Sequence, residues 1–461
     1  MKISRGKGKE ERSRSATTYF VSPSGSDSGS DTNRTYNFRN DQAADVVAME
    51  RGFGGISMNI GRSITITAVL LLVVATLPVA SADWQYQKLI EIDHNKVAAD
   101  LADFPVLINL ASDSDLAAHA QDDGDDIVFT NSANTVKFDH EIEYFNGTTG
   151  ELVAWVRIPS LSSTTNTTIV MRYGNLGCGS QENATGVWDD NYRLVQHLEE
   201  TSGTHYDSTQ YGNDGTKSGE VTQDATGMID GADTFGGSAD YVNCGHDTSL
   251  DITDAITISA WVKPGESDSY QTIVEKASYY DDAYALLVKK DIKYIKFSLI
   301  GIDQHWGYGP VDLWDGNWHY ITGTYDKDGG SNNLRLYVDG SRVNDSTHTN
   351  PIASGAADDV FVGGHNYDGN DFNGTLDEVR ISASARSGDW ISTTYSNTHS
   401  PSTFYTVGDE QSAGPMPPVP DLPAIILFAT GLALVAVYLV FVCAEEAKEG
   451  GVKKDERRYK N

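Results

Sequence analysis

The sequence contains very little cysteine. Only Cys178, Cys244 and Cys443 occur among its 461 residues, and their spacing matches no zinc-binding or thiol-redox motif. Cys178 and Cys244 could pair outside a cell, or both could serve as small buried hydrophobic side chains. The fold therefore does not depend on a framework of disulfide bonds.

Basic residues are scarce relative to acidic ones. The chain has 34 Lys and Arg residues against 65 Asp and Glu residues, which gives a formal net charge of −31. A surface this acidic repels phosphate backbones, so we expect no nucleic-acid partner. The charge favours solubility, binding of divalent cations or a saline environment.

Long apolar runs are limited to two, and the first predicts secretion. It extends from Ile64 to Val79, follows Arg62 and precedes the small residues Ala80-Ser81-Ala82, which is the pattern of a signal peptide. We assign the signal to residues 58–82 and expect Asp83 to become the mature N-terminus. An uncleaved signal anchor is the alternative.

The segment before this signal is polar and rich in glycine and serine. A signal normally begins a chain, so translation could start at Met58. Otherwise residues 1–57 form a disordered cytoplasmic extension.

The second apolar run, residues 424–443, predicts a transmembrane helix. Its length at about 1.5 Å per residue matches a hydrocarbon core of about 30 Å. The Pro-rich residues 411–423 form a stiff linker before it, and residues 444–461 form a basic tail that the positive-inside rule places in the cytoplasm. We therefore expect residues 83–410 to lie outside the cell.

The end of the linker, Pro420-Asp421-Leu422-Pro423, is followed by an apolar segment and a basic tail. This arrangement resembles the C-terminal sorting signals of archaeal surface proteins, which implies exchange of the tail for a lipid by a membrane transpeptidase. A permanent helical anchor is the alternative.

Between Asp83 and Glu410, apolar residues recur with a period of two rather than 3.6. The alternating sets are Phe104, Val106, Ile108 and Leu110; Leu152, Ala154, Val156 and Ile158; Ile169, Met171 and Tyr173; Ile258, Ala260 and Val262; and Leu334, Leu336 and Val338. Each such strand has one buried and one solvated face, as in antiparallel sandwiches. Turn signals such as Asp339-Gly340 separate the strands, and no amphipathic helix is expected. The sequence predicts an all-β fold with two antiparallel β-sandwich or jelly-roll modules.

The first module, residues 83–190, carries several distinctive blocks. They are Trp84-Gln85-Tyr86, Asp103-Phe104-Pro105-Val106-Leu107-Ile108, Ala154-Trp155-Val156-Arg157-Ile158-Pro159 and Met171-Arg172-Tyr173-Gly174-Asn175. This set resembles a domain family of unknown function that is common on prokaryotic, including archaeal, surface proteins. The resemblance implies a position ahead of a lectin-like module and no known activity.

The second module, residues 193–410, resembles the laminin-G-like, concanavalin A-like jelly roll. The blocks that carry the match include Gln196-His197-Leu198-Glu199-Glu200, Ile258-Ser259-Ala260-Trp261-Val262-Lys263-Pro264, Leu336-Tyr337-Val338-Asp339-Gly340 and Gly374-Thr375-Leu376-Asp377-Glu378-Val379-Arg380-Ile381. The resemblance implies the fold but no particular ligand, because this fold hosts lectins, adhesion modules and glycosidases.

The resemblance also implies a calcium site. Many modules of the family hold one ion between an early Asp-Gly-Asn turn and a late Gly-x-x-Asp-Glu strand, and the matching positions are Asp207, Asn213 and Asp377. Carboxylate, amide and carbonyl oxygens are the ligands that Ca²⁺ prefers. The alternative is that Asp207 and Asn213 only form Asx turns.

Sugar binding needs exposed aromatic rings beside amide and carboxylate groups. The loop that contains Asp303, His305, Trp306 and Tyr308 has this composition, and we predict these four residues as ligand contacts. The alternative is that the rings close the edge of the sandwich.

The candidates for a catalytic role are the carboxylates Asp139, Glu141 and Glu143, which alternate along one strand and so share a face. A retaining glycosidase needs two carboxyl groups about 5–5.5 Å apart. The segment nevertheless lacks the full Glu-x-Asp-x-x-Glu spacing of concanavalin-like glycosidases. We therefore interpret it as a solvated sheet face and expect no enzyme.

Asparagine-linked glycosylation is predicted at five Asn-x-Ser/Thr acceptors. They are Asn146, Asn166, Asn183, Asn344 and Asn373. Together these features indicate a surface-anchored binding or adhesion protein that recognises a glycan or glycoprotein. A structural envelope component and a polysaccharide-acting glycoside hydrolase are the alternatives.

Overall fold

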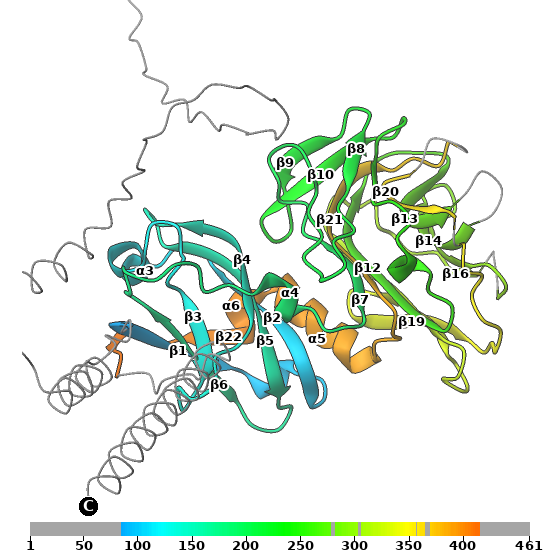
Figure 1. Ribbon diagram of the computed structural model, residues 1–461. Helices are drawn as coiled ribbons and strands as arrows, with labels where there is room; N and C mark the ends of the chain where they lie inside the picture. The colour runs from blue at the N-terminus through cyan, green and yellow to red at the C-terminus, as the bar shows by residue number, and fades with distance from the viewer. Residues whose placement is uncertain (1–83, 278–281, 303–305, 356, 365–368, 415–461) are drawn as a thin grey trace, which may run out of the picture. The chain divides into compact units, whose positions relative to one another are not determined.

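The computed structural model describes residues 84–277, 282–302, 306–355, 357–364 and 369–414 (Figure 1). All strand pairs in this part are antiparallel, and helices are few, so the predicted all-β class is confirmed. The predicted signal peptide and transmembrane helix lie outside the described residues. Within the described part, no helix is long and apolar enough to cross a membrane.

The first module is a sandwich of two sheets. One sheet has the order β22-β1-β6-β3, with β23 also on β1, and the other has the order β2-β5-β4. Their strands are β1 (Tyr86–Ile92), β2 (Leu101–Leu110), β3 (Val128–Asn131), β4 (His140–Asn146), β5 (Glu151–Leu161), β6 (Thr167–Tyr173), β22 (Tyr405–Val407) and β23 (Gln411–Ser412). Short helices η1 (His94–Lys96), α3 (Ser114–His119) and α4 (Ala184–Val187) join them. The alternating residues of β2, β5 and β6 meet in one buried core.

The last two strands of this sandwich come from the far end of the chain. β22 pairs with β1, which sets Val407 opposite Ile90, and β23 pairs with the start of β1. Tyr405 is 4% exposed within the first core. The sequence prediction extended the second module to residue 410, whereas this pairing places residues 405–412 in the first.

The second module is a jelly roll of an eight-stranded and a seven-stranded sheet. The first sheet contains β7 (Tyr192–Gln196), β9 (Thr222–Thr226), β10 (Gly231–Gly236), β12 (Ala255–Pro264), β17 (His319–Asp326), β18 (Leu334–Val338), β19 (Ser341–Ser346) and β21 (Asn373–Ser382). The second contains β8 (Thr216–Ser218), β11 (Tyr241–Asn243), β13 (Tyr270–Ala277), β14 (Asp282–Lys289), β15 (Tyr294–Leu299), β16 (Gly307–Tyr308) and β20 (Asp359–Val362), and η2 (Thr248–Leu250) lies in a loop. Apolar side chains from both sheets form a single large core.

Two helices follow the jelly roll, α5 (Gly388–His399) and α6 (Pro401–Phe404). Ile391 of α5 packs against Trp261, Tyr320 and Tyr337 of the jelly-roll sheet. The Asn397 side chain of α5 bonds both the N–H and the carbonyl of Leu107 in β2, at 2.7 and 3.0 Å. The sequence predicted no amphipathic helix, and the buried face of α5 is indeed mostly polar, but α5 forms here and contacts both modules.

The modules also share an apolar cluster of their own. It joins Leu107, Val153 and Trp155 of the first module to residues of the linker and the second module, namely Val187, Trp188, Tyr192, Val195 and Ile229. Trp155 is fully buried and Trp188 is 2% exposed. The outer faces of β2 and β5 are therefore covered rather than solvated.

Candidate functional site

The predicted sugar loop is only partly described. Asp303 and His305 lie outside the described residues, whereas Trp306 and Tyr308 are half-buried and pack against the jelly-roll core. Tyr308 belongs to β16 and lies opposite Ile295. At least part of each ring therefore serves core packing.

The predicted calcium residues fall into two places. Both oxygens of Asp207 accept hydrogen bonds from the chain, including one from the Asn213 N–H at 2.8 Å. Asp377 instead accepts from the N–H groups of Met228 and Ile229. Within the described ranges, no hydrogen bond joins Asp377 to Asp207 or Asn213. The Asp207 carboxylate thus organises its own turn, and calcium at the three residues together stays a prediction.

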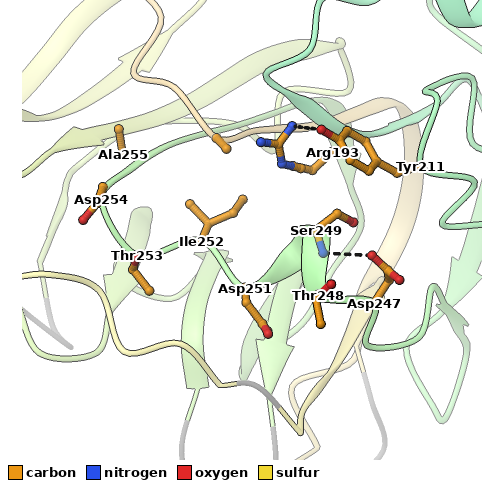
Figure 2. Close-up of a pocket in the computed structure, with 11 residues that line it drawn as sticks. Arg193, Tyr211, Asp247, Thr248, Ser249, Asp251, Ile252, Thr253, Asp254 and Ala255 are labelled. Carbon is orange, nitrogen blue, oxygen red and sulfur yellow. Dashed lines mark hydrogen bonds between the residues drawn. The ribbon is translucent and has the colours of Figure 1, made fainter.

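An open pocket of about 510 Å³ lies on the jelly roll (Figure 2). Figure 2 shows Arg193 and Tyr211 next to each other on one side of it, and the segment from Asp247 to Ala255 around the rest. The Arg193 guanidinium lies 4.6 Å from the Tyr211 ring centroid and donates a 2.8 Å hydrogen bond to the Tyr211 hydroxyl. The aromatic ring is therefore held in place beside carboxylates and hydroxyls.

A second polar pocket of about 730 Å³ shares Asp247 with the first. Asp359 accepts hydrogen bonds here from Asn243 at 2.9 Å and contacts His246 Nδ1 at 2.7 Å. Tyr241 supplies an aromatic ring to the same lining. No sequence motif marks either pocket, because each is assembled from segments that are far apart in the chain.

A cluster of buried charges surrounds His197, which directly follows β7 and is 2% exposed. Glu141 and Glu143 reach it from β4, and Glu378 and Arg380 reach it from β21. The Glu141 and Glu143 side chains are 12% and 1% exposed. The interpretation of Glu141 and Glu143 as part of a solvated face was therefore wrong, because the second module covers them.

Two β-bulges direct these side chains into the cluster. The register of β4 against β5 shifts between Ile142 and Tyr144, which leaves Glu143 as the extra residue. The register of β21 against β12 shifts between Asp377 and Arg380, and Glu378 has a left-handed φ of 54°. Such a conformation is strained for a non-glycine residue and persists only where its surroundings hold it.

The contacts within the cluster are short and specific. His197 Nδ1 lies 2.8 Å from Glu378 Oε1 and 3.4 Å from Glu143 Oε2, and Nε2 lies 3.4 Å from Glu141 Oε2. The indole N–H of Trp155 donates to Glu143, and that of Trp188 donates to Glu141. The Arg380 guanidinium binds Glu378 and stacks over both indoles at 4.3 and 4.7 Å.

Burial and charge shift the protonation of this cluster. Burial, reinforced by nearby carboxylates, raises the pKa values of Glu143 and Asp377 well above the usual range of such carboxyl groups. Despite its burial, the pKa of Glu378 is lowered by Arg380 and His197. Likewise, the three surrounding carboxylates outweigh burial and raise the pKa of His197. Glu143, Asp377 and His197 therefore hold their protons more tightly than the free side chains do.

The predicted glycosylation acceptors differ in exposure. Asn166 and Asn183 are exposed, and Asn146, Asn344 and Asn373 are partly exposed. The side-chain amides of Asn344 and Asn373 donate to the carbonyls of Gly307 and Glu266. The amides of Asn166 and Asn183 likewise donate to Glu91 and Asp139. A glycan on any of these four residues would have to replace a hydrogen bond, and only their greater exposure favours Asn166 and Asn183.

Comparison with protein families gives two matches. Residues 235–392 match the model described as the Concanavalin A-like lectin/glucanases superfamily. Residues 123–216 match a domain of unknown function, DUF2341, and this match continues past Trp188 and His197 into the jelly roll. No curated protein sequence matches the chain.

The solved structures that resemble part of this chain include a domain of an arabinanase and the binding domains of two toxins. Domain 4 of AbnA, a GH43 extracellular arabinanase from Geobacillus stearothermophilus in complex with arabinotriose, is 19% identical over 45% of this chain and 100% of that domain, with a TM-score of 0.35. The botulinum neurotoxin serotype G binding domain is 17% identical over 44% of this chain and 50% of its own, with a TM-score of 0.35. The binding domain of Paraclostridial Mosquitocidal Protein 1 is 12% identical over 45% of this chain and 52% of its own, with a TM-score of 0.37.

The family matches agree with the two sets of blocks in the sequence and with the two sandwiches of the fold. Residues 235–392 are therefore similar to the concanavalin A-like lectin/glucanases superfamily, and residues 123–216 to the DUF2341 family of unknown function.

Proposed function

We propose that the chain is a carbohydrate-binding protein of the cell surface, whose jelly roll recognises a glycan or glycoprotein. The match of this module to the lectin/glucanases superfamily supports a sugar ligand. The two apolar runs of the sequence support secretion and a C-terminal anchor. The formal net charge of −31 favours the solubility of residues 83–410 outside the cell.

The observation that carries the proposal is the pocket of Figure 2. Sugars are recognised by an aromatic ring for their apolar face and by polar groups for their hydroxyls. Tyr211 offers a ring held by Arg193, while Asp247, Ser249 and Asp254 offer oxygens on the same lining.

A glycan array with the full chain in detergent tests this function, first without and then with a chelator. We expect binding of a restricted set of glycans and a loss of at least about tenfold in affinity for Tyr211→Ala, which corresponds to about 1.4 kcal/mol. Tyr206→Ala is the matched control, because Tyr206 is 63% exposed and lies outside the pocket lining. Loss of binding with chelator that Ca²⁺, but not Zn²⁺ or Mn²⁺, restores would add calcium to the recognition.

Two results would contradict the proposal. An array without any bound glycan would favour a structural envelope component. Equal binding by wild type and Tyr211→Ala would show that the Figure 2 pocket does not bind the glycan. The loop that contains Trp306 would then be the next candidate.

We propose no hydrolysis of the bound glycan. A glycosidase must bring two carboxyl groups to an exposed sugar bond, but the Glu141 and Glu143 side chains are buried against His197. Release of reducing sugars from a bound polysaccharide, abolished by Glu141→Gln or Glu143→Gln, would overturn this view.

A further inference from the structure

The cluster around His197 has the arrangement of a metal site rather than of an ordinary ion pair. One ligand atom from each of Glu143, His197 and Glu378 lies within 4.8 Å of the other two. The three residues come from β4, from the end of β7 and from β21, so no local turn forces them together. Nδ1 of His197 faces both carboxylates, and Nε2 faces Glu141.

The cluster gathers more carboxylates than cationic groups. Glu141, Glu143 and Glu378 contact His197, and Arg380 binds Glu378. A cation between these side chains would pair carboxylates that are buried between the modules.

Two carboxylate oxygens have no partner. Among the described residues, Glu143 Oε1 and Asp377 Oδ1 are buried and accept no hydrogen bond. Glu143 and Asp377 are each about 1% exposed, so bulk water cannot satisfy these atoms. Glu143 already contacts His197 through its other oxygen, which places its free oxygen within the cluster.

The surroundings would orient the ligands. Metal-bound histidines usually donate their second ring N–H to a carboxylate, and Glu141 is in position to accept from Nε2. Glu141 is itself held by the Trp188 indole and the Ser208 hydroxyl. The Trp155 indole fixes Glu143 in the same way.

We propose that Glu143, His197 and Glu378 bind one divalent transition-metal ion that cross-links the two modules. An imidazole with carboxylates suits Zn²⁺ or Mn²⁺, whereas Ca²⁺ prefers oxygen ligands alone. The ion lies between His197 Nδ1 and the two carboxylates that face this nitrogen, in place of a proton. This site differs from the predicted calcium residues and does not depend on the glycan-binding proposal.

Metal analysis of the full chain tests the proposal. After chelator treatment and addition of Zn²⁺ or Mn²⁺, followed by dialysis, we expect about one ion per chain, and crystals should give an anomalous peak beside His197 Nδ1. Because loss of an outer-shell partner alone weakens metal binding roughly 10–100-fold, Glu143→Gln should weaken it by more than about 100-fold. Glu199→Gln is the matched control, since Glu199 is a neighbouring, partly exposed carboxylate outside the ligand set.

The metal content and the anomalous peak together distinguish the possible outcomes. Equal binding by wild type and a folded Glu143→Gln would overturn the proposal, as would wild type that binds neither ion and gives no anomalous peak. In the latter case protons rather than a metal ion lie between these side chains. If Glu143→Gln does not fold, the anomalous peak of the wild-type chain decides alone, because it locates the ion without any substitution.

Discussion

At the scale of single residues, His140 controls how acid affects stability. Its side chain is fully buried in β4, and Nε2 has no hydrogen-bond partner in the described part of the chain. Burial, reinforced by the charge of Lys137, lowers the pKa of His140 to about 4 from an ordinary value of 6.5. On acidification, His140 therefore binds a proton at a higher pH in the unfolded chain than in the folded one. The stability linked to this group is fully present above about pH 6.5 and is lost as the pH falls towards 4.

We expect His140→Gln to reduce this acid sensitivity. A shift of this size corresponds to roughly 3 kcal/mol between the two ends of the window. Urea unfolding at pH 7.5 and at pH 4.5 measures the difference, and the variant should lose less free energy of unfolding than wild type by about that amount. Identical losses in the two proteins would mean that His140 does not titrate on unfolding.

Two pairs of residues show why the candidate sites could not be predicted from the sequence. Glu141 and Glu143 have the alternation of a solvated strand face, and only the distant Glu378 and His197 make that face a buried cluster. The rings of Trp306 and Tyr308 have the composition of a sugar site, yet they pack against the core. Composition gives the chemistry of a side chain, but its exposure depends on segments far along the chain.

At the scale of elements, α5 shows the limit of periodicity as a signal. The strands were predicted because their apolar residues alternate, and the Asp339-Gly340 turn joins β18 and β19 with φ values of 49° and 74°, as a two-residue hairpin requires. The buried face of α5, in contrast, is mostly polar, with Thr393, Thr394, Asn397 and Thr398. Only the Ser387 N-cap, which accepts from the Trp390 N–H, offered a local signal.

The Asn397 side chain joins this polar helix to β2. Replacing Asn397 by Ala leaves the buried N–H and carbonyl of Leu107 without partners, and we expect a loss of roughly 2–4 kcal/mol in the free energy of unfolding. Ser396→Ala, one residue earlier on the same helix and partly exposed, is the control. Chemical denaturation measures both variants, and an Asn397→Ala protein as stable as Ser396→Ala would contradict the role of this clamp.

The strands β22 and β23 were not predicted as part of the first module, because two- and three-residue strands carry no periodic pattern. We expect a chain that ends at residue 403 to lose the first sandwich, because it lacks the buried Phe404 and Tyr405 and the pairing with β1. A chain that ends at Gly414 is the control. Protection of the β1 amides in hydrogen exchange should be lost in the shorter chain and kept in the longer one; protection in both would show that β1 is held without the C-terminal strands.

At the scale of the whole molecule, the two modules should unfold together. They share the apolar cluster of Trp155 and Trp188 and the polar clamp of α5, and their separation would expose the buried charges around His197. Calorimetry of wild type should therefore give one transition whose van't Hoff and calorimetric enthalpies agree.

The Trp188→Ala variant should split that transition in two. It removes the indole that bonds Glu141 and stacks under Arg380, and a large-to-small change in such a contact costs about 3–5 kcal/mol. Trp314→Ala is the control, because Trp314 bonds the Gly265 carbonyl within the jelly roll; it should lower the midpoint of a transition that remains single. Two transitions in wild type would mean that the shared cluster is too weak to couple the modules, whereas a single transition in Trp188→Ala would assign the coupling to α5 and the returning strands.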